Sequence, residues 1–169
     1  MTTEGRAEPV VWSEDAGQAV IEAHAGVRGP LLPVLHAVQE ELGYIPAEAV
    51  PVIAAELNLS RADVHGVLTF YSDLRTEPAG RVVVQVCRAE ACQSVGAQDL
   101  LDGASARLGV PVGSTRADGE VTLEEVFCLG NCALGPSALV GGRLAGRLDA
   151  ERLAALVDRA GQAEAGVVR

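Results

Sequence analysis

The four cysteines constrain this chain more than any other feature, because they form two close pairs in its second half. Cys87 and Cys92 have the spacing C-x4-C, and Cys128 and Cys132 have the spacing C-x3-C. Each pair follows an apolar, strand-like run, so both pairs are expected in or beside loops. Four thiolates brought together in this way are typical of a metal site.

Two cysteine pairs could belong to a structural zinc site, a redox dithiol or an iron–sulfur cluster. Structural zinc most often uses C-x2-C knuckles, and a redox dithiol favours C-x-x-C. Neither pair has that spacing, whereas an iron–sulfur cluster spreads four thiolates over two irons and tolerates wider, unequal spacings. Gly96, Gly130 and Gly135 would let the backbone curl so that N–H groups point at the sulfurs. The spacing favours a [2Fe–2S] cluster, with zinc and a disulfide or free thiols left open.

Composition limits the class of partner and the compartment. The net charge of −10 disfavours nucleic acid and anionic membrane surfaces, which would repel the chain. No secretory signal pattern opens the sequence, and no apolar run approaches the roughly 18 residues of a membrane span. A cytoplasmic protein without membrane insertion is therefore expected. In a reducing compartment, paired cysteines are more often ligands than disulfides.

The first half of the chain predicts a small helical bundle. After a flexible arm over 1–12, apolar residues recur at helical spacing, so residues 13–75 are expected to bury their stripes against each other. Ser60 and Asp63 form S-x-x-D, which resembles a capping box. The expected helices cover 13–26, 30–43, 47–57 and a segment that opens at Ser60. The apolar stripe of this fourth helix is expected to consist of Val64, Val67, Leu68 and Tyr71.

The second half predicts an α/β sheet. A break at 76–80 (TEPAG) marks a linker, and the domain is expected over 81–160 with a frayed tail over 161–169. The predicted strands cover 82–87, 121–127, 137–140 and 143–148, with helices over 94–108 and 149–160. The fold class is thus α+β, a helical bundle followed by a sheet domain. Because both cysteine pairs follow strands, their loops are expected at one edge of the sheet.

The cysteine segments resemble a known family. CRAEACQSVG and TRADGEVTLEEVFCLGNCALGPSALV are similar to the thioredoxin-like [2Fe–2S] ferredoxin family, which includes the 24 kDa subunit of respiratory complex I. LPVLHAVQEELGYIP and IAAELNLSRADVHGVLTFYSDLR resemble the helical region that precedes the ferredoxin domain in that family. The resemblance implies a thioredoxin-like domain with one [2Fe–2S] cluster. It also implies four ligands, Cys87, Cys92, Cys128 and Cys132, and no catalytic residue.

Within the family, CRAEACQS and HAVQEELGYIP look most like the gamma subunit of soluble, NAD-dependent, molybdenum-containing formate dehydrogenases. This implies a non-catalytic electron-transfer subunit of an oxidoreductase, with a flavin- and NAD-binding beta subunit and a molybdenum-containing alpha subunit as partners. FMN, NAD and the molybdenum cofactor are expected on those partners, since the chain has no nucleotide-binding motif. The alternatives are the equivalent subunit of NADH:quinone oxidoreductase or of an NAD-reducing hydrogenase. A zinc-stabilised interaction module is an alternative of another class.

Other polar and aromatic residues are expected to have ordinary roles. His24, His36 and His65 are isolated, and Glu40–Glu41 is expected to be a solvated helix face. Phe70 and Tyr71 are expected in the core or against a partner. Arg88, between two predicted ligands, either tunes the cluster's potential or faces solvent.

Overall fold

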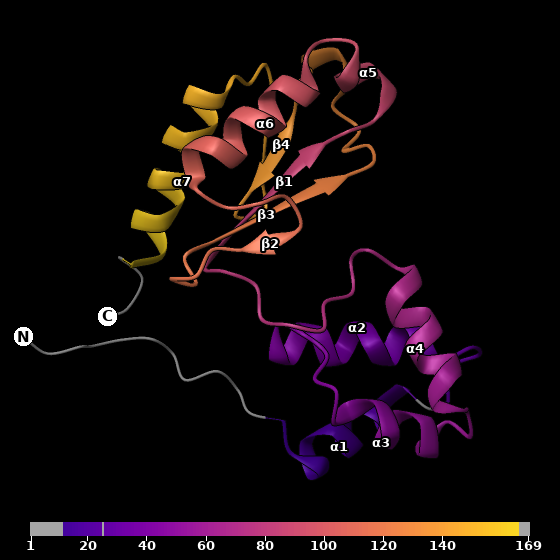
Figure 1. Cartoon of the computed structure of the whole chain (residues 1–169). Helices are drawn as coiled ribbons and strands as arrows, with labels where there is room; N and C mark the ends of the chain where they lie inside the picture. The colour runs from indigo at the N-terminus through magenta and orange to yellow at the C-terminus, as the bar shows by residue number, and fades with distance from the viewer. Residues whose placement is uncertain (1–11, 25, 166–169) are drawn as a thin grey trace, which may run out of the picture. The chain divides into compact units, whose positions relative to one another are not determined.

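The computed structural model describes residues 12–24 and 26–165, and the chain divides into two compact units, Met1–Pro78 and Ala79–Arg169 (Figure 1). The division falls inside the segment 76–80. Each unit has its own hydrophobic core. No helix within the described ranges is long and apolar enough to cross a bilayer. Residues 1–11 of the predicted arm lie outside the described residues.

The N-terminal unit is a bundle of short helices, as predicted. Proline at position 30 precedes the second helix and Gly43 ends it at φ 80°, a left-handed conformation that suits glycine. The Ser60 hydroxyl accepts the N–H of Asp63, and the Asp63 carboxylate accepts the N–H of Ser60, which confirms the capping box. The helices are α1 (Glu14–His24), α2 (Leu31–Leu42), α3 (Ala49–Glu56) and α4 (Arg61–Phe70).

Aliphatic side chains fill the core of this unit. Its buried members are Ile21, Val34, Leu35, Val38, Ile45, Ala49, Ile53, Ala54, Val64, Leu68 and Leu74. The sequence pattern also predicts Tyr71 on the apolar stripe of the fourth helix, and this is wrong. Helix α4 ends at Phe70, and Tyr71 is extended at φ −90° and ψ 110°, so it leaves the helical stripe and is 37% exposed. Phe70 is 79% exposed and is not a core residue.

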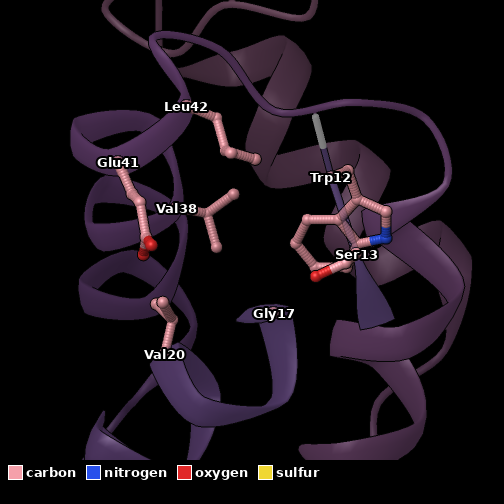
Figure 2. Close-up of a pocket in the computed structure, with 7 residues that line it drawn as sticks. All are labelled: Trp12, Ser13, Gly17, Val20, Val38, Glu41 and Leu42. Carbon is pink, nitrogen blue, oxygen red and sulfur yellow. The ribbon is translucent and has the colours of Figure 1, made fainter. Parts of the chain in front are cut away.

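Trp12 falls within the predicted flexible arm, but it packs against this bundle. Its indole lies beside Gly17 of α1, where an added Cβ would overlap the ring atom Cη2. Figure 2 shows the ring together with Val38 and Leu42 of α2, which are turned toward the same small cavity. The only tryptophan of the chain is therefore partly buried, because a glycine leaves room for it.

The C-terminal unit is built on a five-stranded mixed sheet in the order β2-β3-β1-β4-β5. The two central strands, β1 and β3, are parallel, and Val82 lies opposite Val121. The outer pairings, β1 with β4, β2 with β3 and β4 with β5, are antiparallel. The strands are β1 (Val82–Cys87), β2 (Ser114–Thr115), β3 (Val121–Val126), β4 (Ala138–Val140) and β5 (Arg143–Ala145).

Two long helices, α6 (Ala97–Leu108) and α7 (Ala150–Ala165), pack against each other and against β1 (Figure 1). Alternate residues of β1 are buried beneath them, as a strand with one covered face requires. The core residues are Val82, Val84, Val86, Leu100, Leu101, Ala104, Leu108, Val110, Val121, Leu123, Ala138, Val140, Leu148, Leu153 and Val157.

The predicted strands and helices of this unit are confirmed in outline. Helix α6 begins at Ala97 rather than at residue 94, and the short 3-10 helix η1 (Cys132–Leu134) was not expected. The one-turn helix α5 (Glu90–Gln93) and strand β2 were not expected, and β5 ends at Ala145 rather than at residue 148. The predicted frayed tail from residue 161 is wrong as far as residue 165, because α7 continues through Gly161. The guanidinium of Arg81 donates to the Gly161 carbonyl and also pairs with Glu120, which ties this part of the helix to the sheet.

Candidate metal centre

The parallel pairing of β1 and β3 brings the two cysteine loops together. Cys87, the last residue of β1, lies opposite Val126, the last residue of β3, so both chains leave the sheet at the same edge. The N–H of Arg88 donates to the Val126 carbonyl at 2.8 Å. The N–H of Cys87 donates to the carbonyl of Ser137 at 2.9 Å, which ties in the far end of the second loop. The expectation that the two loops meet at one sheet edge is confirmed.

Each loop curls through backbone conformations that its glycines allow. Gly96 (φ 92°) lies between α5 and α6, and Gly130 (φ 74°) lies between the second pair of cysteines. Gly135 approaches the first loop closely, since a Cβ there would lie 3.4 Å from the Cys92 sulfur and 3.0 Å from Val95 Cγ2. Cys128 itself has φ 76°, which is strained for a residue with a Cβ and is characteristic of functional sites.

The thiols interact in the two pairs that the sequence suggested. Hydrogen bonding with Cys92 lowers the pKa of Cys87, and hydrogen bonding with Cys128 raises the pKa of Cys132. Electrostatic interactions also act between the two pairs. Cys132 contributes to the raised pKa of Cys92, and Cys87 contributes to the raised pKa of Cys132. All four sulfurs therefore belong to one electrostatic site.

Backbone N–H groups from both loops point at the Cys87 sulfur. Burial opposes the charged form of this thiol, but N–H donors of Ala89, Leu129 and Cys128 and the Cys92 thiol outweigh it, so the pKa of Cys87 lies below its usual value. This arrangement favours the thiolate form of Cys87 more than an ordinary thiol's surroundings would. It is the donor set that a negatively charged iron–sulfur unit requires.

The partner thiols are shifted in the other direction. Burial, together with the hydrogen bond to Cys87, raises the pKa of Cys92, although the N–H of Ser137 opposes this shift. The hydrogen bond to Cys128 and the proximity of that sulfur raise the pKa of Cys132.

The site is buried on one side and open on the other. Cys87 and Cys92 are 1% and 2% exposed, whereas Cys128 and Cys132 are exposed. Three exposed apolar side chains lie on the same two loops, which is unusual on a polar surface. They are Val95, Phe127 and Leu134. We call these three residues the apolar rim.

The donor set fits a dinuclear cluster. Two thiol pairs, one from each loop, with N–H groups directed at the sulfurs, can serve two metal ions with two ligands each. Across residues 12–24 and 26–165, no three or more His, Cys, Asp or Glu side chains lie close enough together to hold a metal ion as they stand. Arg88 is not simply solvent-facing, because its Nη1 pairs with Glu125 at 2.9 Å and its Nε is buried.

The remaining sequence candidates have a local partner or are exposed. The Nδ1 of His24 contacts the Val20 carbonyl at 2.9 Å within α1, and His36 lies 3.8 Å from Asp73. His65, Glu40 and Glu41 are exposed, as expected of solvated helix faces.

Sequence reasoning missed Ser137, whose buried backbone serves both Cys87 and Cys92. The available signal was its position in the sequence, two residues after Gly135 and directly before strand β4. It also missed α5, which carries Cys92, because four residues are too few to show a helical period.

The family model described as thioredoxin-like [2Fe–2S] ferredoxin matches residues 17–161 of the chain. Among curated proteins, the E 2 subunit of the NADH-quinone oxidoreductase of Rhizobium meliloti (strain 1021) is 37% identical over 131 residues, 78% of each chain. The HndA subunit of the NADP-reducing hydrogenase of Solidesulfovibrio fructosivorans is 31% identical over 128 residues, covering 76% of this chain and 75% of that protein.

A solved structure also resembles this one. The NAD+-reducing [NiFe]-hydrogenase in its air-oxidized state matches 79% of this chain with a TM-score of 0.63 and 25% identity, over 23% of its own chain. The matching region is therefore one part of a longer protein. From the family match and the sequence relatives, the chain belongs to the thioredoxin-like [2Fe–2S] ferredoxin family.

Proposed function

We propose that Cys87, Cys92, Cys128 and Cys132 bind one [2Fe–2S] cluster, and that the chain transfers single electrons within an NAD-linked oxidoreductase complex. One observation carries this proposal: two thiol pairs meet at one sheet edge, with backbone N–H donors from both loops aimed at the Cys87 sulfur. Cys87 and Cys92 would bind one iron, and Cys128 and Cys132 the other. When bound, the cluster supplies a one-electron couple.

The protein's own residues would hold the cluster's negative charge. The N–H groups of Ala89, Cys128 and Leu129 act on one ligand sulfur, and the N–H of Ser137 acts on another. Burial of the first pair limits water at that side of the site. The chemistry belongs to the cofactor, and the chain provides ligation, charge compensation and access.

The open side of the site is suited to docking. Electrons pass efficiently only when the donor and acceptor are close, so the exposed pair, Cys128 and Cys132, would face the partner. The apolar rim lies on the same two loops as the cysteines, and exposed apolar patches mark interaction sites. The relatives are named as subunits, which supports a complex whose flavin- and NAD-binding chain docks here.

Within this class we propose the gamma subunit of an NAD-dependent formate dehydrogenase. The segments CRAEACQS and HAVQEELGYIP support this assignment by resemblance. A 24 kDa-type subunit of NADH:quinone oxidoreductase or of an NAD-reducing hydrogenase is the second candidate, and the names of the sequence relatives favour it. Purification of the tagged chain with its native partners separates the two: co-purified molybdenum and formate-dependent NAD reduction support the first, and their absence from an otherwise active complex refutes it.

The cluster is tested on anaerobically purified protein. About two irons and two acid-labile sulfides per chain are expected, with an S = 1/2 EPR signal after dithionite reduction. Zinc without sulfide, unchanged after reconstitution with iron and sulfide, would overturn the proposal in favour of a zinc-stabilised module.

Ligand variants test the residue assignment. Cys92→Ser and Cys128→Ser should each lose or rearrange the cluster while the helicity of the N-terminal unit stays largely intact. Ser94→Ala is the matched control, because its hydroxyl bonds only the nearby Ala91 carbonyl among the contacts of the described residues. Unchanged visible absorption in either cysteine variant would contradict the ligand set.

A further inference from the structure

Strand β5 leaves one edge of the sheet without a neighbour. It is the last strand in the order β2-β3-β1-β4-β5, and within the described part of the chain it pairs only with β4, with Leu139 opposite Leu144. In an antiparallel ladder, alternate residues direct their N–H and C=O groups away from the paired strand. Among the described residues, no backbone hydrogen bond outside the ladder involves Arg143, Leu144 or Ala145. The outer side of β5 can therefore accept another strand.

A groove runs between this edge and helix α7. It has a volume of about 620 Å³, and its floor is made of small or aliphatic residues. Ala160 and Ala163 lie on the helix side, with Ala145 on the strand side. Small side chains let an approaching backbone come close, so the groove suits an extended segment better than a bulky helix.

The groove is positively charged in a chain of net charge −10. Arg143 and Arg159 line it, and no Asp or Glu does. Neither arginine has an ion pair or hydrogen bond to another residue in the ranges that the structure describes. An acidic segment would be repelled by most of this molecule but attracted here.

We propose that the edge of β5 and this groove bind an extended acidic segment of another subunit of the same complex, which pairs with β5 as a sixth strand. Its carboxylates would pair with Arg143 and Arg159, which hold carboxylates through forked N–H donors. Main-chain hydrogen bonds to β5 would supply affinity, and the alanine floor would accept one small apolar side chain. A second copy of this chain fits poorly, because it would bring two arginine-lined grooves together with no acid between them.

This inference rests on the proposed function only in taking the chain to be a subunit of a complex. The first test is hydrogen exchange of the holoprotein, free and in its native complex, purified through a tag at the N-terminus. Backbone amides over 141–148 are expected to exchange at least about tenfold more slowly in the complex. Equal rates in the two states would overturn the proposal.

The second test reverses the charges. The double variant Arg143→Glu/Arg159→Glu should weaken association with the rest of the complex by about tenfold or more, with the loss growing at low salt. Arg107→Glu is the matched control, an exposed arginine at the end of α6 that lies outside the groove, and it should change association less than about twofold. An equal loss in the control would overturn the proposal. If the double variant folds poorly, Arg143→Gln/Arg159→Gln takes its place, and it should likewise weaken association more than the control variant does.

The occupant is identified by a photo-crosslinking residue at position 163, which is exposed and lines the groove. A crosslinked peptide with Asp or Glu beside the crosslinked residue supports the proposal, and a crosslink to a second copy or to a segment without acids refutes it. Iron content and the EPR signal are measured on the same samples. A missing cluster with intact β5 protection would count against the proposed function alone, whereas an intact cluster with unprotected β5 would count against this inference alone.

Discussion

Replacement of Ala89 by proline should lower the reduction potential of the cluster by deleting a single hydrogen bond. The N–H of Ala89 donates to the Cys87 sulfur, and proline has no N–H. The backbone of Ala89 has φ −70° and ψ 159°, which a proline ring adopts without strain. The preceding residue, Arg88, continues the strand ladder through its bond to Val126, and extended backbone suits the position before proline.

The size of the shift follows from the charge on the cluster. A hydrogen bond to a charged group contributes about 1.5–3 kcal/mol, and a four-cysteine [2Fe–2S] unit carries roughly −2 when oxidised and −3 when reduced. If the bond strengthens in proportion to charge, the reduced form loses about 0.5–1 kcal/mol more than the oxidised form. For one electron, a tenfold change in equilibrium constant is about 59 mV, so the potential should fall by about 20–40 mV.

The assay is a mediated redox titration followed by EPR, on protein with a measured iron content. Glu90→Pro is the control, compared with Glu90→Gln to allow for the lost charge. Glu90 is exposed and is the first residue of α5, a position that proline favours. Among the described contacts, its N–H does not reach a sulfur. A potential for Ala89→Pro that is unchanged, or higher than that of the wild type, in a fully loaded cluster would refute the reasoning.

Four further predictions concern folding. Gly17→Ala would place a Cβ inside the space of the Trp12 ring, so the ring should leave the bundle and the fluorescence of the only tryptophan should shift to the red; an unshifted spectrum would contradict the packing. Ser60→Ala should destabilise the N-terminal unit by about 1 kcal/mol in urea unfolding. Hydrogen bonds from the Ser60 hydroxyl and N–H lower the pKa of Asp63. The stability that Asp63 contributes is therefore present above its unfolded-state pKa and is lost as pH falls through its folded-state pKa. A stability difference between Asp63→Asn and wild type that persists in strong acid would be inconsistent with this. Leu123→Ala, at a fully buried position in β3, should cost about 2–5 kcal/mol, and a loss below about 1 kcal/mol would argue against that core.

The helices of the N-terminal unit were predictable because their signals are local. Glycine at position 43 and the pair Ser60 and Asp63 act within one turn of their helices, so the sequence shows where those helices begin or end. Tyr71 was misplaced because the helix ended one residue earlier than its apolar stripe. Trp12 was misplaced because its partner, Gly17, offers only an empty space, which has no pattern in sequence.

The end of α7 shows the same limit. Glycine at position 161 is a common signal for the end of a helix, yet α7 continues to Ala165. The Arg81 guanidinium, from the start of the sheet, contacts the Gly161 carbonyl and ties the helix to the sheet there. A contact between residues so far apart in the chain overrides the local preference.

For the candidate site, the available side chains can be read from the chain itself: four cysteines, in two pairs, each after a strand. That information is local, because spacing and apolar runs are properties of short segments. The meeting of the two loops is not local, since it requires the parallel pairing of β1 and β3, which also directs N–H groups from both loops to Cys87. The open edge of β5 and its arginine-lined groove likewise depend on strand order. Which strands become neighbours is set by burial of the common core, and that burial involves residues from the whole C-terminal unit at once.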